Sequence, residues 1–378
     1  MRVLPFGVLL AAAFHLAACD TSAPGASSDP FAEAEANVGE WTWIDVEDSM
    51  CRDGSSTGLG VRLQPDADGL VVFLDAGGAC YDIATCRQNR SRYGKADFPR
   101  FARGDGQAGL FDPDLAPVNP VGTWDAVFVP YCTGDQHNGD ATDVEVPGVA
   151  GLQQFVGRRN MEHYVDWLAP YFGDRDRLLL TGSSAGGYGA LYNSGLVAEA
   201  FPDAHVAVVD DSGPLFEDDA VLSPRLQRRL RALYDLDANL PDGFPDRDGD
   251  GLAAAYAAFA ERYPDVTFGL LSFDADATVR TFLGPDALDA ETPSPLDAGL
   301  FRAALYDEVA RLPEGWGAYV VPGEGHVLLD DPFVLNTFWY GPEEPSVFSW
   351  LGNLLDGRPE IVTGRAKGEA PGSDVSRR

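Results

Sequence analysis

The sequence is poor in positive charge. Lysine occurs only at Lys95 and Lys367, and 27 Lys and Arg residues face 59 Asp and Glu residues, which gives a formal net charge of −32. Nucleic acids and anionic membrane surfaces carry the same sign of charge, so both are poor partners and we expect no nucleic-acid binding. The abundant carboxylates fit either an adaptation to salt or a simple bias in composition.

Long hydrophobic runs are also missing after the N-terminus, so no later segment is expected to span a bilayer. The one such run follows Arg2, covers residues 8–18 and ends in Leu16-Ala17-Ala18-Cys19, which resembles a bacterial lipobox. We therefore interpret residues 1–18 as a lipoprotein signal peptide and Cys19 as the lipidated residue. This interpretation predicts an exported, membrane-anchored protein on the periplasmic or cell-surface side. An ordinary signal peptide with a coincidental Cys19 is the alternative.

The few cysteines show neither a CxxC spacing nor an accompanying cluster of histidines, which argues against a zinc site. Four remain when Cys19 is set aside, and an even number in an exported chain predicts two disulfide bonds with three possible connectivities. A bond between Cys80 and Cys86 closes a short loop, and this leaves Cys51 to pair with Cys132.

The length of 378 residues suits one large α/β domain, which we place at residues 38–362. Residues 19–37 are rich in Ala, Ser, Pro and Glu and are expected to form a flexible linker. The polar residues 363–378 are expected to form a disordered tail. A chain of this length buries enough core to fold without a metal, and we expect a monomer.

Apolar runs with strand character alternate with helical patterns along the domain. The expected strands cover residues 41–46, 60–63, 69–74, 124–130, 178–180, 204–209, 266–273 and 316–322, and the clearest helices cover 160–168, 188–200 and 348–355. This order predicts a mostly parallel sheet flanked by helices, with ligands bound at the carboxyl ends of the strands. The mixed, mostly helical residues 215–263 are expected to form a cap-like insertion over that edge.

The strongest motif is Gly182-Ser183-Ser184-Ala185-Gly186, between an expected strand and an expected helix. It fits the G-x-S-x-G nucleophile elbow, in which a sharp turn exposes the central serine and small neighbours avoid clashes. The N-terminus of the following helix offers N–H groups to an oxyanion. The motif therefore predicts Ser184 as a nucleophile, against the alternative of an ordinary Gly/Ser turn.

A second glycine-rich stretch, Asp75-Ala76-Gly77-Gly78-Ala79-Cys80, follows directly after the expected strand at residues 69–74. Glycines let the backbone turn its N–H groups inward, as in the HGGG-type oxyanion loop of lipases. A plain glycine turn is the alternative. The position after an early strand and upstream of the elbow favours the oxyanion role.

A serine nucleophile needs a base and an acid that orients the base. His326 follows the last expected strand on a glycine-flanked loop, where α/β-hydrolases place their histidine, whereas His137 lies on a loop expected near the site. The acid should lie between serine and histidine in the chain, at the end of a strand. Three aspartates meet this condition: Asp211, Asp274 and Asp276.

Asp246, Asp248, Asp250 and Gly251 match the first half of an EF-hand calcium loop. Ala257 stands where the bidentate glutamate is required, so calcium would need another oxygen ligand. The alternatives are a structural calcium site and an acidic turn that caps a helix.

Five stretches in this order resemble the pectin acetylesterase and Notum family of carboxylesterases: Cys51-Arg52-Asp53-Gly54-Ser55, residues 73–80, residues 131–140, the nucleophile elbow and Asp211-Ser212-Gly213. The resemblance implies an α/β-hydrolase fold and hydrolysis of carboxylic esters through an acyl-enzyme, with no cofactor. It implies a triad of Ser184, Asp276 and His326, with Asp274 as the other candidate acid. It also implies oxyanion donors at the backbone N–H groups of Gly77, Gly78 and Ala185.

The substrate implied by the resemblance is an acylated carbohydrate, with acetate removed from a polysaccharide such as pectin. Ala79 stands where members of the family carry aromatic residues, so the wall of the acyl pocket differs. An esterase for longer acyl chains, Notum-like or lipase-like, therefore stays open. A non-catalytic surface lipoprotein that binds glycan or calcium is the alternative from another class.

Overall fold

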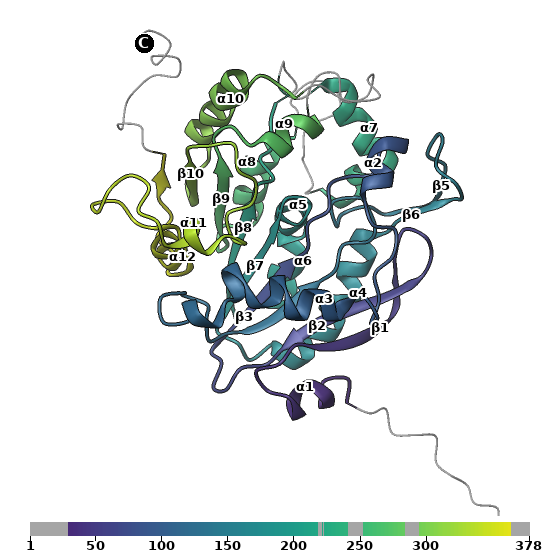
Figure 1. The fold of residues 1–378 in the computed structure, drawn as a ribbon, viewed down its shortest axis with the longest axis horizontal. Helices are drawn as coiled ribbons and strands as arrows, with labels where there is room; N and C mark the ends of the chain where they lie inside the picture. Colours follow the sequence, from purple (N-terminus) through teal and green to yellow (C-terminus); the bar gives the residue numbers. More distant parts are fainter. Residues whose placement is uncertain (1–28, 218–220, 222, 241–251, 284–294, 364–378) are drawn as a thin grey trace, which may run out of the picture.

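The computed structural model describes residues 29–217, 221, 223–240, 252–283 and 295–363. Its centre is a nine-stranded sheet with the order β1-β2-β4-β3-β7-β8-β9-β10-β11 (Figure 1). β1 pairs with β2 and β2 with β4 in antiparallel fashion, and all other neighbours are parallel. The strands are β1 (Thr42–Met50), β2 (Ser56–Arg62), β3 (Gly69–Leu74), β4 (Asp125–Val129), β7 (Arg177–Ser183), β8 (His205–Asp211), β9 (Thr267–Phe273), β10 (Trp316–Val321) and β11 (Ile361–Val362).

Helices cover both faces of this sheet (Figure 1). The α-helices of the described residues are α1 (Ala32–Ala36), α2 (Ile83–Gln88), α3 (Phe98–Arg103), α4 (Gly157–Phe172), α5 (Ala185–Tyr192), α6 (Ser194–Ala200), α7 (Pro224–Tyr234), α8 (Ala254–Arg262), α9 (Ala277–Leu283), α10 (Ala298–Arg311), α11 (Pro332–Asn336) and α12 (Val347–Leu355). Short 3-10 turns cover Asp105–Gln107, Gly109–Phe111, Pro113–Leu115 and Leu236–Asn239. A separate two-stranded sheet pairs β5 (Ala141–Val144) with β6 (Gln153–Phe155).

The continuous apolar runs in the sequence arise because the central strands are buried on both faces. In β3, Leu70, Val72 and Leu74 pack with α4, α6 and α8, whereas Val71 and Phe73 pack with α3 and α12. A third apolar cluster joins α7, α9 and α10, which Figure 1 shows gathered at the end of the sheet where β9 and β10 finish. The predicted mostly parallel sheet with helices on both faces is therefore confirmed.

The prediction of a flexible linker at residues 19–37 is wrong for the last residues of that range. Residues 32–36 form α1, and the Phe31 side chain, 3% exposed, stacks on Tyr171 of α4 with ring centroids 3.9 Å apart. Burial of this aromatic ring outweighs the polar composition of the segment. Cys19, the signal peptide and residues 364–378 lie outside the described residues.

The cap-like insertion expected at residues 215–263 contains elements in two different environments. α7 packs with α9 and α10 through Leu226 and Leu230, whereas α8 packs on the sheet, where Tyr256 contacts Trp316 with ring centroids 4.8 Å apart. The expected helix at residues 188–200 is divided into α5 and α6 at Asn193. Its side-chain amide donates to the carbonyl oxygens of Gly189 and His137, which ties the break to a neighbouring loop.

Both predicted disulfide bonds are formed, Cys51–Cys132 and Cys80–Cys86. The first joins the segment after β1 to the loop after β4, and the second joins the glycine-rich loop after β3 to α2. Within the described ranges, no helix combines the length and apolar character needed to cross a bilayer.

Candidate active site

Ser184 lies in the sharp turn between β7 and α5. Its φ of 56° and ψ of −113° are strained for a residue with a side chain, and its N–H donates to the Asp211 carbonyl oxygen at 2.7 Å. A Cβ atom at Gly182 would meet the Leu74 carbonyl oxygen at 2.5 Å, and one at Gly186 would collide with the same atom. The small residues of the motif are therefore required by close packing against β3, as the elbow interpretation predicts.

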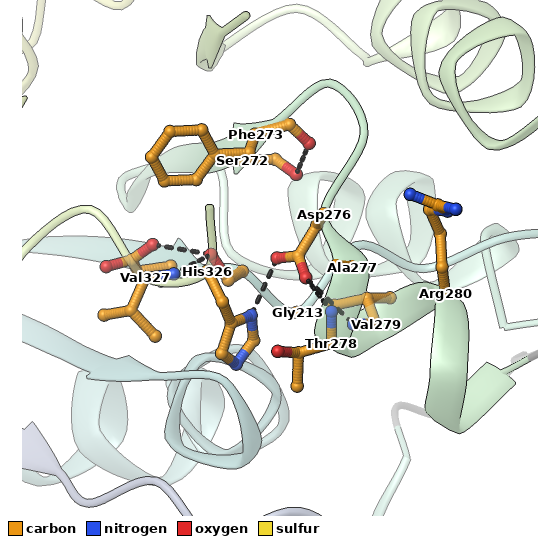
Figure 2. Close-up of polar contacts among 12 residues, drawn as sticks. Gly213, Ser272, Phe273, Asp276, Ala277, Thr278, Val279, Arg280, His326 and Val327 are labelled. Atoms are coloured by element: carbon orange, nitrogen blue, oxygen red, sulfur yellow. Dashed lines mark hydrogen bonds and ion pairs between the residues drawn. The ribbon is translucent and has the colours of Figure 1, made fainter. Parts of the chain in front are cut away.

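His326 and Asp276, 50 residues apart in the chain, form a hydrogen bond. The imidazole Nδ1 donates to Asp276 Oδ2 at 2.7 Å, and Asp276 Oδ1 accepts the N–H groups of Thr278 and Val279 at 2.9 Å each (Figure 2). The Asp276 side chain is fully buried, whereas that of His326 is 21% exposed. The first turn of α9 thus fixes a carboxylate that in turn fixes the ring, which leaves Nε2 for proton transfer.

Asp274, the other candidate acid, has different partners. Its carboxylate accepts two hydrogen bonds from Arg302, at 2.9 and 3.2 Å, and one from the N–H of Gly323 at 3.0 Å. The geometry therefore assigns Asp274 to the packing of α10 against the β9 and β10 loops, and Asp276 to the histidine.

Asp211, the third candidate, bonds the backbone of the loop that follows His326. Its carboxylate accepts the N–H groups of Leu328 and Leu329, at 2.9 and 2.8 Å, and the Ser212 hydroxyl at 3.0 Å. Ser212 Oγ also accepts the N–H of Val327 at 3.0 Å. This role was missed in the sequence, although the position of Asp211-Ser212-Gly213 at the end of β8 was a usable signal.

The glycine-rich loop after β3 presents unpaired backbone donors. Among the described residues, no acceptor bonds the N–H groups of Gly77, Gly78 or Ala185. Gly78 has a φ of +72°, which favours glycine, and its carbonyl oxygen accepts the Tyr131 hydroxyl at 2.8 Å. This arrangement fits an oxyanion hole, because its donors are held in place before an oxyanion forms.

His137 lies behind this loop and not in the pocket. Its ring is 3% exposed, and Nε2–H donates to the Asp75 carbonyl oxygen at 3.0 Å. Burial lowers the pKa of His137 to about 4, so the ring is neutral and acts as a fixed donor. Its contribution is to hold the start of the glycine-rich loop.

A pocket opens beside Ser184, between this loop, α7 and α9. It is lined by Ala79, Leu230, Val279 and Phe282, together with Ser184 and Ala185. The volume of this pocket is about 30 Å³. Ser184 and His326 form no hydrogen bond with each other among the described residues, a bond that is often long before substrate binds.

The proposed calcium residues Asp246, Asp248 and Asp250 lie outside the described residues. Within the part of the chain that the structure describes, no group of three His, Cys, Asp or Glu side chains is arranged to hold a metal ion.

Comparison with protein families gives a match over residues 33–240 to the family described as Pectinacetylesterase, more than half of the 378-residue chain. The match includes the glycine-rich loop and the nucleophile elbow. It ends before Asp276 and His326, so the second half of the site is supported by geometry alone.

Curated relatives match part of the chain. Palmitoleoyl-protein carboxylesterase NOTUM of Drosophila melanogaster is 30% identical over 178 residues, 43% of this chain and 26% of that protein. The Homo sapiens NOTUM is 30% identical over 175 residues, 43% of this chain and 34% of that protein. Pectin acetylesterase 11 of Arabidopsis thaliana is 27% identical over 175 residues, 44% of this chain and 42% of that protein. The chain therefore matches less than half the length of these relatives.

Among solved structures, the Wnt deacylase Notum from Drosophila superposes with a TM-score of 0.64 at 19% sequence identity. The superposition covers 86% of this chain and 97% of that chain. It confirms the predicted α/β-hydrolase fold.

Proposed function

This chain belongs to the pectinacetylesterase family, and from that premise we propose that it is a serine carboxylesterase acting through an acyl-enzyme on Ser184. The observation that carries the proposal is the hydrogen bond from His326 to the buried Asp276, at the edge of the sheet that also carries the strained Ser184. A serine, then a buried carboxylate, then a histidine along the chain is the order of the catalytic triad in α/β-hydrolases.

In the proposed mechanism, Ser184 Oγ attacks the ester carbonyl carbon while His326 Nε2 accepts the hydroxyl proton. The N–H groups of Gly77, Gly78 and Ala185 bind the oxyanion, and His326 returns the proton to the leaving alcohol as the ester C–O bond breaks. Water then attacks the acyl-enzyme with His326 as base, which releases the acid and restores the serine. Asp276 holds the imidazole in the required tautomer throughout.

We propose acetate, carried by a polysaccharide such as pectin, as the acyl group removed. The space of about 30 Å³ beside Ser184 has room for roughly two water molecules, by the ~10–15 Å³ that each requires. That volume suits an acetyl group. A long acyl chain would require the side chains of Leu230 and Phe282 to move.

The alternative is an esterase for longer acyl chains. Two observations favour it: the pocket walls are apolar, and the NOTUM relatives are named palmitoleoyl-protein carboxylesterases. Ala79 also leaves more room at its position than an aromatic residue would. A series of nitrophenyl esters of increasing chain length distinguishes the two, since acetate should be the best substrate if the pocket keeps its present size.

The test of the catalytic proposal is Ser184→Ala, with Ser183→Ala as the matched control. Ser184→Ala should lower turnover of nitrophenyl acetate by about 10⁴-fold or more while the protein stays folded, and the control should retain substantial activity. Full activity in the Ser184 variant refutes the mechanism. An inactive but folded parent protein would favour the non-catalytic alternative, a lipoprotein that binds glycan or calcium.

We also propose that the mature protein is exported and held at a membrane by lipid on Cys19. The two disulfide bonds support an oxidising compartment. Calcium at Asp246, Asp248 and Asp250 is a further proposal, and it rests on the half-motif alone. Calcium titration calorimetry tests it, and the absence of binding at millimolar calcium would leave the acidic-turn interpretation.

A further inference from the structure

One segment of this acidic chain has the opposite charge. Residues 87–103 contain six of the 27 Lys and Arg residues but only one of the 59 Asp and Glu residues, Asp97. The segment includes the end of α2 and all of α3, and it runs along the sheet face that carries Phe73 and Phe128. A local concentration of positive charge on a protein with a net charge of −32 requires a reason other than general composition.

Four arginines of this segment line one cleft. Arg90, Arg92, Arg100 and Arg103 line a space of about 610 Å³, which is about twenty times larger than the pocket beside Ser184. α3 is anchored beneath it by Phe101, which stacks on Phe128 with ring centroids 3.5 Å apart. The apolar side of α3 is therefore buried, and its arginines lie on the outer side.

The cleft adjoins the proposed oxyanion loop. Asp75, the first residue of that loop, lines the cleft, and Gly78 and Ala79, three and four residues later, line the pocket beside Ser184. Two contacts join the arginine segment to the loop: Arg90 pairs with Asp75 at 3.7 Å, and the Asn89 amide donates to the Gly77 carbonyl oxygen at 2.7 Å. The pocket and the cleft are therefore lined by neighbouring residues of the same short loop.

The arginines are available to a ligand. Arg100 and Arg103 are exposed, and neither forms an ion pair or a side-chain hydrogen bond with another described residue. Arg90 and Arg92 do have partners, but their side chains are 51% and 70% exposed. Exposed ion pairs of this kind contribute little to the free energy of folding, so a ligand can compete for these guanidinium groups.

Three carboxyl groups also line the cleft, those of Asp75, Asp97 and Asp105. Desolvation raises the pKa of Asp75 to about 7, so this group carries less than a full charge near neutral pH. A mixture of guanidinium and carboxyl groups suits a sugar acid, because planar guanidinium groups pair with carboxylates and aspartates accept hydrogen bonds from hydroxyl groups.

We propose that this arginine cleft binds the carboxylate groups of a uronic-acid polysaccharide while an ester on the same polysaccharide enters the pocket beside Ser184. This proposal rests on the proposed esterase function. It adds where the polysaccharide that carries the leaving hydroxyl group binds, and through which of its chemical groups. The negative charge elsewhere on the protein does not prevent binding, because physiological salt screens exposed charges beyond about 8–10 Å. Nucleic acid has a denser charge along its backbone and is repelled more strongly by the surrounding surface.

The test is calorimetric titration of the full chain with an ester-free oligogalacturonate of defined length. The parent should bind it, and binding should weaken as salt is added. Arg100→Gln with Arg103→Gln should weaken it by about tenfold or more, because two charged donors are lost. The matched control is Arg262→Gln with Arg358→Gln, two exposed arginines that do not line the cleft. Equal affinity of parent and cleft variant, or equal loss in the control, overturns the proposal.

Two further arms separate the possible failures. A neutral galactan oligomer should not bind, and a sulfated dextran that binds more tightly than oligogalacturonate would overturn the assignment to carboxylates. In kinetic measurements, the cleft variant should lower the ratio of kcat/KM for acetylated polygalacturonate to that for nitrophenyl acetate, mainly through KM. Loss of nitrophenyl acetate hydrolysis in Ser184→Ala tests the esterase proposal alone. If the parent is active and this kcat/KM ratio is the same in the parent and the cleft variant, the cleft proposal alone is refuted.

Discussion

The buried carboxylate of Asp211 accepts the backbone N–H of Leu329 at 2.8 Å, which joins the end of β8 to the loop that carries His326. The same carboxylate accepts the N–H of Leu328, and Ser212 Oγ accepts that of Val327. Three consecutive N–H groups after His326 are thus held by two adjacent side chains. Asp211 is therefore a positioning residue for the proposed base.

Asp211→Ala should lower kcat for nitrophenyl acetate far more than it changes KM, because the loop loses the acceptor that places His326. It should also lower the free energy of unfolding by about 1–3 kcal/mol, since buried N–H groups lose their partner. Asp211→Asn keeps one acceptor oxygen and should restore part of kcat. Steady-state kinetics and urea unfolding measure both effects, and a normal kcat in Asp211→Ala would contradict the positioning role.

Asp276→Asn should lower kcat strongly, because an amide does not stabilise the imidazolium that forms during catalysis and can favour the wrong tautomer. Asp274→Asn is the matched comparison two residues away, and it should affect stability more than kcat because Asp274 pairs with Arg302. Kinetics with nitrophenyl acetate decide between them. The reverse order of effects would transfer the role of the acid to Asp274.

Asp211 and Asp135 should each contribute stability that is lost as the pH rises from about 4 to about 7. Burial raises the pKa of Asp211 to about 7 and that of Asp135 to about 6, so the folded state holds these protons at pH values where the unfolded state has lost them. Each unit of elevation is worth about 1.4 kcal/mol. Urea unfolding across this range measures the slope, and Asp135→Asn should flatten it. The exposed Asp166→Asn should not, and equal slopes in both variants would contradict the prediction.

The two disulfide bonds should differ in their effects. Cys51 and Cys132 are separated by 81 residues, so replacing both with serine should lower the free energy of unfolding by about 2–5 kcal/mol. Cys80 and Cys86 are separated by 6 residues, and their loss should cost less stability. Relative to the stability lost, removing Cys80–Cys86 should lower activity more than removing Cys51–Cys132 does, because Cys80 lies beside the proposed oxyanion loop. Thermal unfolding and nitrophenyl acetate kinetics give both quantities.

Cys19→Ala should move the protein from the membrane fraction to the soluble fraction, because the proposed lipid attachment site is lost. Secretion, fold and nitrophenyl acetate hydrolysis should persist in the variant if the signal is still cleaved. Fractionation of cells that express the parent and the variant measures the difference. Identical fractionation would show that the anchor is not at Cys19.

The sequence by itself determined the features that depend on neighbours in the chain. The apolar runs of β3 and β7 predict buried strands because strand burial leaves no polar face, and the elbow around Ser184 is readable because its glycines are required by local packing. The disulfide pairing followed from the number and spacing of the cysteines. The early folded segment around Phe31 was not readable, because its stability comes from a ring on α4.

Only the tertiary structure decided between groups whose partners are distant in the chain. Asp274 and Asp276 are both aspartates that follow β9. Which of them bonds the histidine is decided by their partners: Arg302, 28 residues from Asp274, and His326, 50 residues from Asp276. The support of the histidine loop by Asp211 spans 118 residues. The charge of residues 87–103 is visible in the sequence, but its place beside the oxyanion loop is not. Side-chain direction in a loop is set by whatever packs against it, and that information lies in the fold.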